Sequence, residues 1–150
     1  MAGRTYAAFD QQDIVSPGDT ILAVQGTAEL RLDFIYLSFS TLGDELDDMI
    51  QWTVQRFDTA DGTFDALTPT AFVDSDPASG ATVTGNHSAE PTYVAGQVLL
   101  DIAVNTRSFQ QWYAQPGREF ATALGANEGL GVIPLHATGP LGLCTIHYVE

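Results

Sequence analysis

Lysine is absent from this 150-residue sequence, and its only basic side chains are five arginines. Nineteen acidic residues oppose them and give a formal net charge of −14 at pH 7. A surface this negative repels phosphate groups, which disfavours both nucleic acid and an anionic membrane surface. We therefore predict neither as a partner. The acidity is either a solubility device or a match for a partner with basic patches.

Cysteine is almost absent as well, since Cys144 is the only one and no intrachain disulfide can form. In an extended chain Cys144 alternates onto the same face as Ile146 and Tyr148, which predicts a buried, inert thiol. No apolar run approaches the roughly 20 residues of a membrane-spanning helix. The first six residues lack the apolar centre of a secretory signal, so we expect the protein to be made in a cytoplasm.

Catalytic and ligand-binding motifs are also missing. The sequence has neither the G-x-S-x-G pattern nor a phosphate-binding glycine loop before a helix. His87 is predicted in an exposed loop, and His136 and His147 in strands, none at a metal-ligand spacing. The acidic stretches 44–48 and 74–76 do not follow the spacing of a calcium loop. We therefore predict no catalytic residue, no metal and no cofactor, and hence no enzyme.

The sequence does contain many short segments of strand character, separated by turns rich in Gly, Pro, Asn and Asp. Some eight to ten such segments in one domain-sized chain are typical of an antiparallel β-sandwich or barrel. Residues 20–150 are predicted to form that single domain. Residues 1–19 are either an N-terminal arm that packs on a neighbouring molecule or an edge strand of the domain itself.

The strongest strand signal lies in residues 96–113, the stretch around which the rest of the chain is expected to be organised. A turn at Pro116-Gly117 and a returning extended run over 118–124 follow it. Residues 41–50 predict either a turn of helix or an acidic loop before a strand over 51–57. The side chains expected to be largely buried are Trp52, Val98, Leu100, Ile102, Val104 and Ile146.

One predicted strand changes character along its length. In residues 28–40, Arg31 and Asp33 begin a polar face that becomes apolar at Ile35, Leu37 and Phe39. Such a face passes from water to a covered environment, and the cover is either the protein's own loops or another subunit. Tyr6 and Phe9 add apolar side chains to a terminal segment otherwise poor in them. The five apolar residues, Tyr6, Phe9, Ile35, Leu37 and Phe39, are candidates for a subunit or capsid interface.

Three stretches of the sequence resemble a family of small virion proteins of tailed bacteriophages. The resemblance covers roughly the last two-thirds of the chain and is one of overall pattern. It involves Arg56 with 62–69 and 74–78, then 109–117 (Phe-Gln-Gln-Trp-Tyr-Ala-Gln-Pro-Gly), and then 129–150. Members of this family resemble jelly-roll, or tumour-necrosis-factor-like, sandwiches. The resemblance therefore implies an antiparallel jelly-roll β-sandwich.

The same resemblance implies a structural function. It predicts a homotrimer that binds the major capsid protein as a decoration or cement protein and is located on the capsid surface of the virion. The alternative is a receptor- or glycan-binding module of a tail or head fibre. In the first case Trp112 and Tyr113 pack at a subunit interface, and in the second they stack on sugar rings. A small cupin-type jelly-roll enzyme is a third possibility, which requires clustered His and carboxylate ligands.

Overall fold

The computed structural model describes residues 3–15, 18–42, 47–59, 64–123, 127–136 and 140–150. These residues form strands and connecting segments, with no helix that is able to cross a membrane. The strands are β1 (Thr5–Asp13), β2 (Leu22–Gln25), β3 (Asp33–Leu42), β4 (Met49–Thr59), β5 (Asp65–Leu67), β6 (Thr70–Ala71), β7 (Thr82–Gly85), β8 (Thr92–Asn105), β9 (Gln110–Tyr113), β10 (Phe120–Ala121), β11 (Gly129–Leu135) and β12 (Leu141–Val149).

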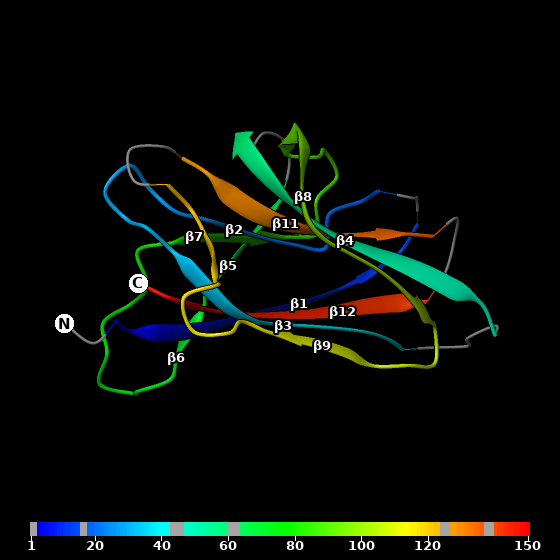
Figure 1. Cartoon of the computed structure of the whole chain (residues 1–150), viewed down its shortest axis with the longest axis horizontal. Helices are drawn as coiled ribbons and strands as arrows, with labels where there is room; N and C mark the ends of the chain where they lie inside the picture. The colour runs from blue at the N-terminus through cyan, green and yellow to red at the C-terminus, as the bar shows by residue number, and fades with distance from the viewer. Residues whose placement is uncertain (1–2, 16–17, 43–46, 60–63, 124–126, 137–139) are drawn as a thin grey trace.

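Two antiparallel six-stranded sheets pack face to face, and the predicted all-β sandwich is confirmed (Figure 1). The first sheet has the order β10-β3-β12-β1-β6, with β9 also paired to β3, and the second has the order β5-β7-β2-β11-β4-β8. The twelve strands of the described residues exceed the predicted eight to ten because β5, β6 and β10 span only two or three residues each. Such short pieces leave almost no periodic signal in a sequence.

The pairing of the eight main strands is that of a jelly roll. The first pairs with the last (β1 with β12), the second with the seventh (β2 with β11), the third with the sixth (β3 with β9) and the fourth with the fifth (β4 with β8). The pairs β3–β12 and β4–β11 then join these ribbons into two sheets. An antiparallel ribbon folded over in this way gives the two Greek keys of a jelly roll.

The segment between β4 and β8 covers one side of the sandwich. Its strands β7 and β5 extend the second sheet beyond β2, and β6 extends the first sheet beyond β1 at two residues. Added strands reduce the number of unpaired backbone groups at the edges of both sheets. The edge of β1 nevertheless remains uncovered from residue 8 onward by any described strand.

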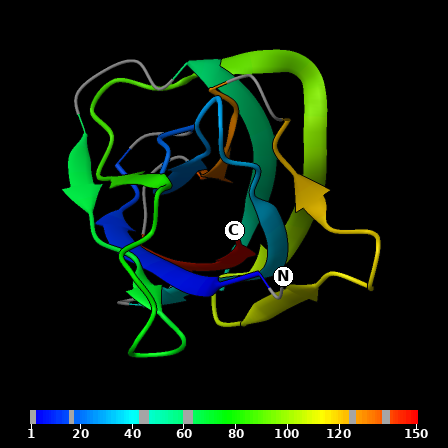
Figure 2. The ribbon, with the colours of Figure 1, turned by 90° about the vertical axis from the view of Figure 1, so that its left-hand side faces the viewer.

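The two sheets lie on opposite sides of the core (Figure 2), which contains the buried aromatic side chains of Tyr6, Phe34, Phe39, Trp52 and Tyr148. Tyr6 stacks on Tyr148 with ring centroids 5.7 Å apart, and Phe39 stacks on Trp52 at 5.4 Å. Buried and half-buried residues alternate strictly along β12, as expected when one face of a strand points into the core. Ile146 and Trp52 are buried as predicted, and so is Cys144.

The prediction for the strand over 98–104 was only partly right. Leu100, Ile102 and Val104 are half-buried and pack against the core, whereas Val98 is 47% exposed. The reason is that β8 is the last strand of its sheet and pairs only with β4. Its pairing is also irregular around Val98, where the register shifts. The stretch expected to organise the fold therefore lies at its edge.

Three further expectations concern the N-terminal segment, residues 41–50 and the turn at Pro116-Gly117. Residues 5–13 pair with β12 along their whole length, so they belong to the sandwich and are not a free arm. The edge-strand interpretation fits residues 8–13, where only one side is paired. Residues 43–46 lie outside the described residues, and the flanking strands end at Leu42 and begin at Met49. The turn at Pro116-Gly117 is present, closed by a 2.8 Å bond from Arg118 N–H to the Gln115 carbonyl.

Candidate functional site

The outer face of the first sheet carries a row of rings that crosses three strands. Phe72 contacts His147 at a centroid distance of 4.9 Å, His147 contacts Tyr36 at 4.5 Å, and Tyr36 contacts Tyr113 at 4.9 Å. Gln111 donates a 2.8 Å hydrogen bond to the Tyr36 hydroxyl. We call Phe72, His147, Tyr36 and Tyr113 the aromatic row.

The strand register explains why these side chains point outward together. His147, Tyr36 and Tyr113 are directly opposite one another on β12, β3 and β9. Directly paired residues project from the same face of a sheet, so their rings lie side by side. Phe72 follows β6 and is held near the sheet by a 2.9 Å bond from its N–H to the Thr5 carbonyl.

Further apolar side chains lie on the same outer face. The exposed fractions are 63% for Tyr113 and 56% for Phe72 in the aromatic row, and 52% for Phe9 and 59% for Leu42 outside it. Half-buried Leu141 and Leu143 lie on this face as well, since their neighbours along β12 point into the core. Exposed aromatic and aliphatic side chains gathered on one face are typical of interaction sites in soluble proteins.

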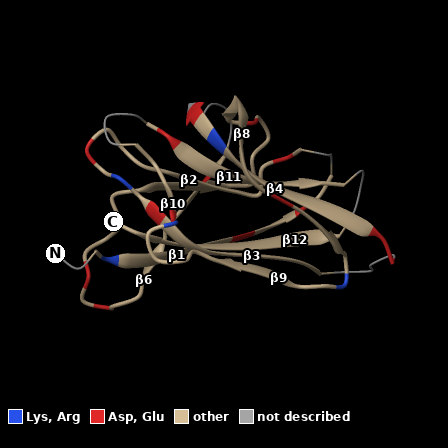
Figure 3. Ribbon diagram, in the orientation of Figure 1, with Lys and Arg blue, Asp and Glu red and all other residues tan. Residues whose placement is uncertain are grey.

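The outer face is also free of charge near its centre. Strands β6, β9, β10 and β12 contain no Asp, Glu, Lys or Arg, and the first sheet as a whole contains only three acidic residues (Figure 3). Of these, Asp13 and Asp33 lie at strand ends and Asp10 lies on the inward face of β1. Partial burial lowers the pKa of His147, which favours its neutral form at pH 7. The centre of this outer face is therefore uncharged in a protein that is very acidic as a whole.

The structure separates the seven candidate interface residues into two groups. Tyr6, Leu37 and Phe39 are at most 1% exposed and belong to the core, so their assignment to an interface is corrected. Trp112 also points toward the core side, where it stacks on Phe120 with centroids 4.3 Å apart. The remaining three are at the surface or half-buried, namely Phe9, Ile35 and Tyr113.

A β-bulge explains why β3 was misread. Phe34 faces the core opposite Tyr148, but the next pair along the strands is Tyr36 with His147, which leaves Ile35 as an extra residue. An extra residue reverses the alternation, so even-numbered residues point inward before the bulge and odd-numbered ones after it. The polar-to-apolar change noted in the sequence is this reversal. It placed Leu37 and Phe39 in the core and moved Tyr36 to the surface.

Sequence reasoning also missed residues at the other end of the sandwich. His87 is only 3% exposed, and its Nε2 lies 3.0 Å from the Thr84 hydroxyl, so the prediction of an exposed histidine was wrong. Phe64 contacts its ring at 5.6 Å. Burial lowers the pKa of His87, which favours the neutral imidazole. No signal in the local sequence distinguishes this histidine from one in open solvent.

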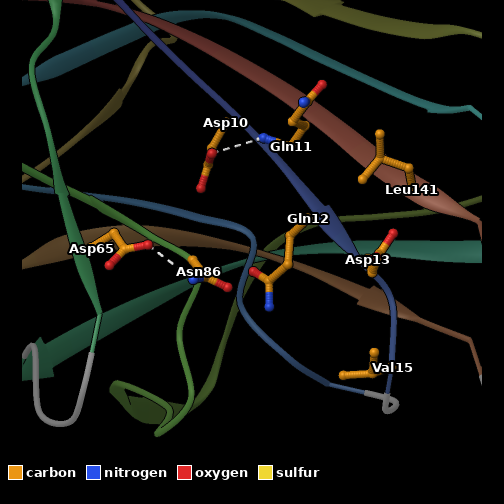
Figure 4. A pocket seen from close by; sticks show the side chains of 8 residues that line it. All are labelled: Asp10, Gln11, Gln12, Asp13, Val15, Asp65, Asn86 and Leu141. Atoms are coloured by element: carbon orange, nitrogen blue, oxygen red, sulfur yellow. Dashed lines mark hydrogen bonds between the residues drawn. The ribbon is translucent and has the colours of Figure 1, made fainter.

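A second feature is a cavity of about 490 Å³ between β1 and the ends of β5 and β7 (Figure 4). Its lining is polar and acidic, with two aliphatic side chains: Asp10, Gln11, Gln12, Asp13, Val15, Asp65, Asn86 and Leu141. Asn86 donates a 2.9 Å hydrogen bond to Asp65 across one wall. Within the described residues, no three His, Cys, Asp or Glu side chains are placed to hold a metal ion.

Asp10 is the least favourably placed carboxylate of this cavity. Burial raises its pKa above the ordinary value of 3.8, which outweighs the lowering by hydrogen bonds from the backbone of Gln11 and Asn86. Its Oδ2 is enclosed and has no hydrogen-bond partner among the described residues. An ionised Asp10 is therefore less stable in the folded chain than in the unfolded chain.

This unfavourable charge leads to a pH-dependent prediction for Asp10→Asn. Above the raised pKa, wild-type Asp10 is ionised and reduces the stability of the fold, so the variant is expected to have the higher free energy of unfolding at pH 7. Below pH 3.8 Asp10 is neutral in both states, and the difference is expected to vanish as the pH falls through this window. Urea unfolding of both proteins at several pH values measures the difference, and a gain that stays constant down to pH 3 would contradict this assignment.

Comparison with known proteins adds no relative: no family model, no curated protein and no solved structure matches the chain. The resemblance to bacteriophage virion proteins therefore stays a prediction, and the aromatic row and the acidic cavity are the two features of the structure that bear on function.

Proposed function

We propose that the protein is a structural component of a tailed-bacteriophage particle, a capsid decoration or cement protein that stabilises the head shell as a homotrimer. The observation that carries the proposal is the aromatic row on a sheet face that has no charge at its centre. An apolar face exposed to water gives a protein no stability, so its exposure indicates that a binding partner covers it. A symmetric assembly of copies covers it at low cost, because each copy supplies the same apolar surface.

The charge distribution supports copies of this chain as the first partner. Each copy carries a net charge of −14, so two copies repel wherever acidic surfaces meet. The outer face of the first sheet is the place where that repulsion is weakest. Burying exposed aromatic side chains there contributes on the order of several kcal/mol at about 25 cal/mol per Å², before the cost of association.

The proposed contact with the shell follows from what remains exposed after the copies assemble. The acidic loops and the second sheet then remain at the surface of the oligomer (Figure 3). An acidic surface suits basic patches of the major capsid protein. The trimer number and the phage assignment come from the sequence resemblance. The jelly-roll fold agrees with them, since this fold recurs in viral capsid and lectin domains.

A second candidate is a receptor- or glycan-binding module of a tail or head fibre. Tyr113, at the end of the aromatic row, is 63% exposed and presents a ring on which a sugar can stack. In this alternative the face binds a ligand, and copies of the chain need not meet there.

The experiment that tests the proposal is an image reconstruction of the phage particle that contains the protein, together with its copy number per particle. We expect density for the protein on the outside of the head shell, in copies comparable in number to those of the major capsid protein. A few copies confined to a tail or fibre would favour the second candidate. Absence of the protein from purified particles would contradict both.

A further inference from the structure

One edge of β1 is open to another strand. Arg4 and Glu150 exchange both backbone hydrogen bonds, at 3.1 and 2.9 Å, so the even-numbered residues of β1 direct their backbone groups toward β12. Phe9, Gln11 and Asp13 therefore direct theirs to the opposite side. Beyond Ala7, no strand in the described part of the chain pairs with that side. Of these groups, the Gln11 N–H is bound by Asp10 Oδ1 at 2.8 Å.

The acidic cavity runs along this same edge. Four consecutive residues, 10–13, line it, and they include both inward- and outward-facing positions of β1. A hollow beside a strand edge can contact consecutive residues in this way, because successive side chains point to opposite faces. Asp65 and Asn86 form the far wall, from the second sheet (Figure 4).

The cavity has a surplus of hydrogen-bond acceptors. Asp13 and Asp65 present exposed carboxylates, and the side chains of Asp10 and Gln12 are partly buried. Asp10, Asp13 and Asp65 line the cavity, and no basic side chain does. Ammonium and guanidinium groups carry three and five N–H donors, no acceptor and a positive charge. A lysine or arginine side chain therefore supplies what this lining lacks.

We propose that the open edge of β1 binds an extended segment of a basic partner protein by strand addition, with a Lys or Arg side chain of that segment in the cavity. In strand addition, backbone hydrogen bonds provide affinity and pockets for alternate side chains provide specificity. Every second side chain of the added strand enters the cavity. The others lie on the outer face beside Phe9, where apolar side chains fit.

The partner is a different protein from the one described here. This chain has no lysine and a net charge of −14, so a second copy is repelled from a cavity lined by three carboxylates. The inference goes beyond the proposed oligomer, which uses the aromatic row of the sheet face and leaves the backbone groups of this edge open. Peptide binding tests it on the purified protein, whatever its oligomeric state.

The test is a titration of the full chain with a capped seven-residue peptide of alternating valine and lysine, followed by calorimetry and by NMR of the backbone amides. We expect saturable binding, with chemical-shift changes and slowed hydrogen exchange at the amides of Phe9 and Asp13.

The double variant Asp10→Asn with Asp65→Asn is expected to weaken peptide binding at least about ten-fold, as for removal of close charge partners. The matched pair Asp58→Asn with Asp101→Asn, at exposed positions of the second sheet, changes the net charge equally and is expected to have little effect.

Two altered probes separate the parts of the interaction. Methylating the peptide's edge-facing amide nitrogens removes the backbone donors and is expected to weaken binding about ten-fold or more. Replacing its lysines with glutamates is expected to abolish binding. Because Asp10 is partly buried, the single variant Asp65→Asn, at an exposed residue, keeps the test valid if the double variant does not fold.

Several results would overturn the inference. These are no binding at millimolar peptide, the same affinity for the methylated as for the unmethylated peptide, or an equal loss of peptide affinity in the two double variants. Putrescine that binds the cavity as tightly as the peptide would overturn strand addition. Calcium that shifts the same amides at lower concentration than the peptide would replace the proposal with a metal site.

Discussion

Replacing Trp52 with alanine is expected to lower the free energy of unfolding by about 3–5 kcal/mol, the largest effect of any single substitution considered. Trp52 is 1% exposed and stacks on Phe39, so it joins the two sheets through the centre of the core. Its removal leaves a large cavity where strands β3 and β4 face each other. Because its indole N–H has no hydrogen-bond partner among the described residues, the loss is one of packing.

Urea unfolding, followed by a signal that does not depend on Trp52, measures this loss. Val98→Ala is the control, since Val98 is 47% exposed on the edge strand β8, and a change within about 0.5 kcal/mol is expected there. A loss below about 1 kcal/mol for Trp52→Ala would contradict the placement of the core. So would a larger loss for Val98→Ala than for Trp52→Ala.

Replacing Tyr113 with aspartate is expected to weaken self-association by about 2–5 kcal/mol for each interface that buries it. The substitution puts an unpaired carboxylate on the aromatic row, where a neighbouring copy would remove it from water. Its neighbours Tyr36 and Gln111 supply no positive charge to compensate for it. At 63% exposure in the single chain, Tyr113 is not needed for folding, so the fold is expected to remain intact.

The matched control for Tyr113→Asp is Ala103→Asp. Ala103 is exposed on β8 of the other sheet, so this variant adds the same charge away from the proposed interface. We expect it to associate nearly as wild type does. If the two substitutions weakened self-association equally, the loss would be due to net charge, and the outer face of the first sheet would not be the interface.

The sequence was sufficient to predict features that depend on local pattern. Alternation identified Ile146 and Cys144 as buried, and the Pro-Gly pair at 116–117 identified a turn, in which Gly117 adopts a φ of 78°. Positive φ of this kind is accessible to glycine without steric cost, so the signal is physical. The sandwich itself followed from the number and spacing of such segments.

Features that depend on pairing were not predictable. The bulge at Ile35 reverses the facing of β3, and the polar-to-apolar change that accompanies it in the sequence does not distinguish a bulge from a face covered by another subunit. The edge position of β8 leaves Leu100, Ile102 and Val104 only partly buried, because burial depends on neighbours from distant parts of the chain. For the same reason the aromatic row, which combines residues 36, 72, 113 and 147, has no signature in any one segment.

Sedimentation equilibrium of the wild-type chain across a salt series tests the central claim most directly, namely that copies of the protein meet through the outer face of the first sheet. We expect a trimer at micromolar concentration that tightens as salt increases, because salt screens the repulsion between chains of charge −14. Tyr113→Asp is expected to shift the equilibrium to monomer, and Ala103→Asp is not. A monomeric wild-type protein at every salt concentration would contradict the claim.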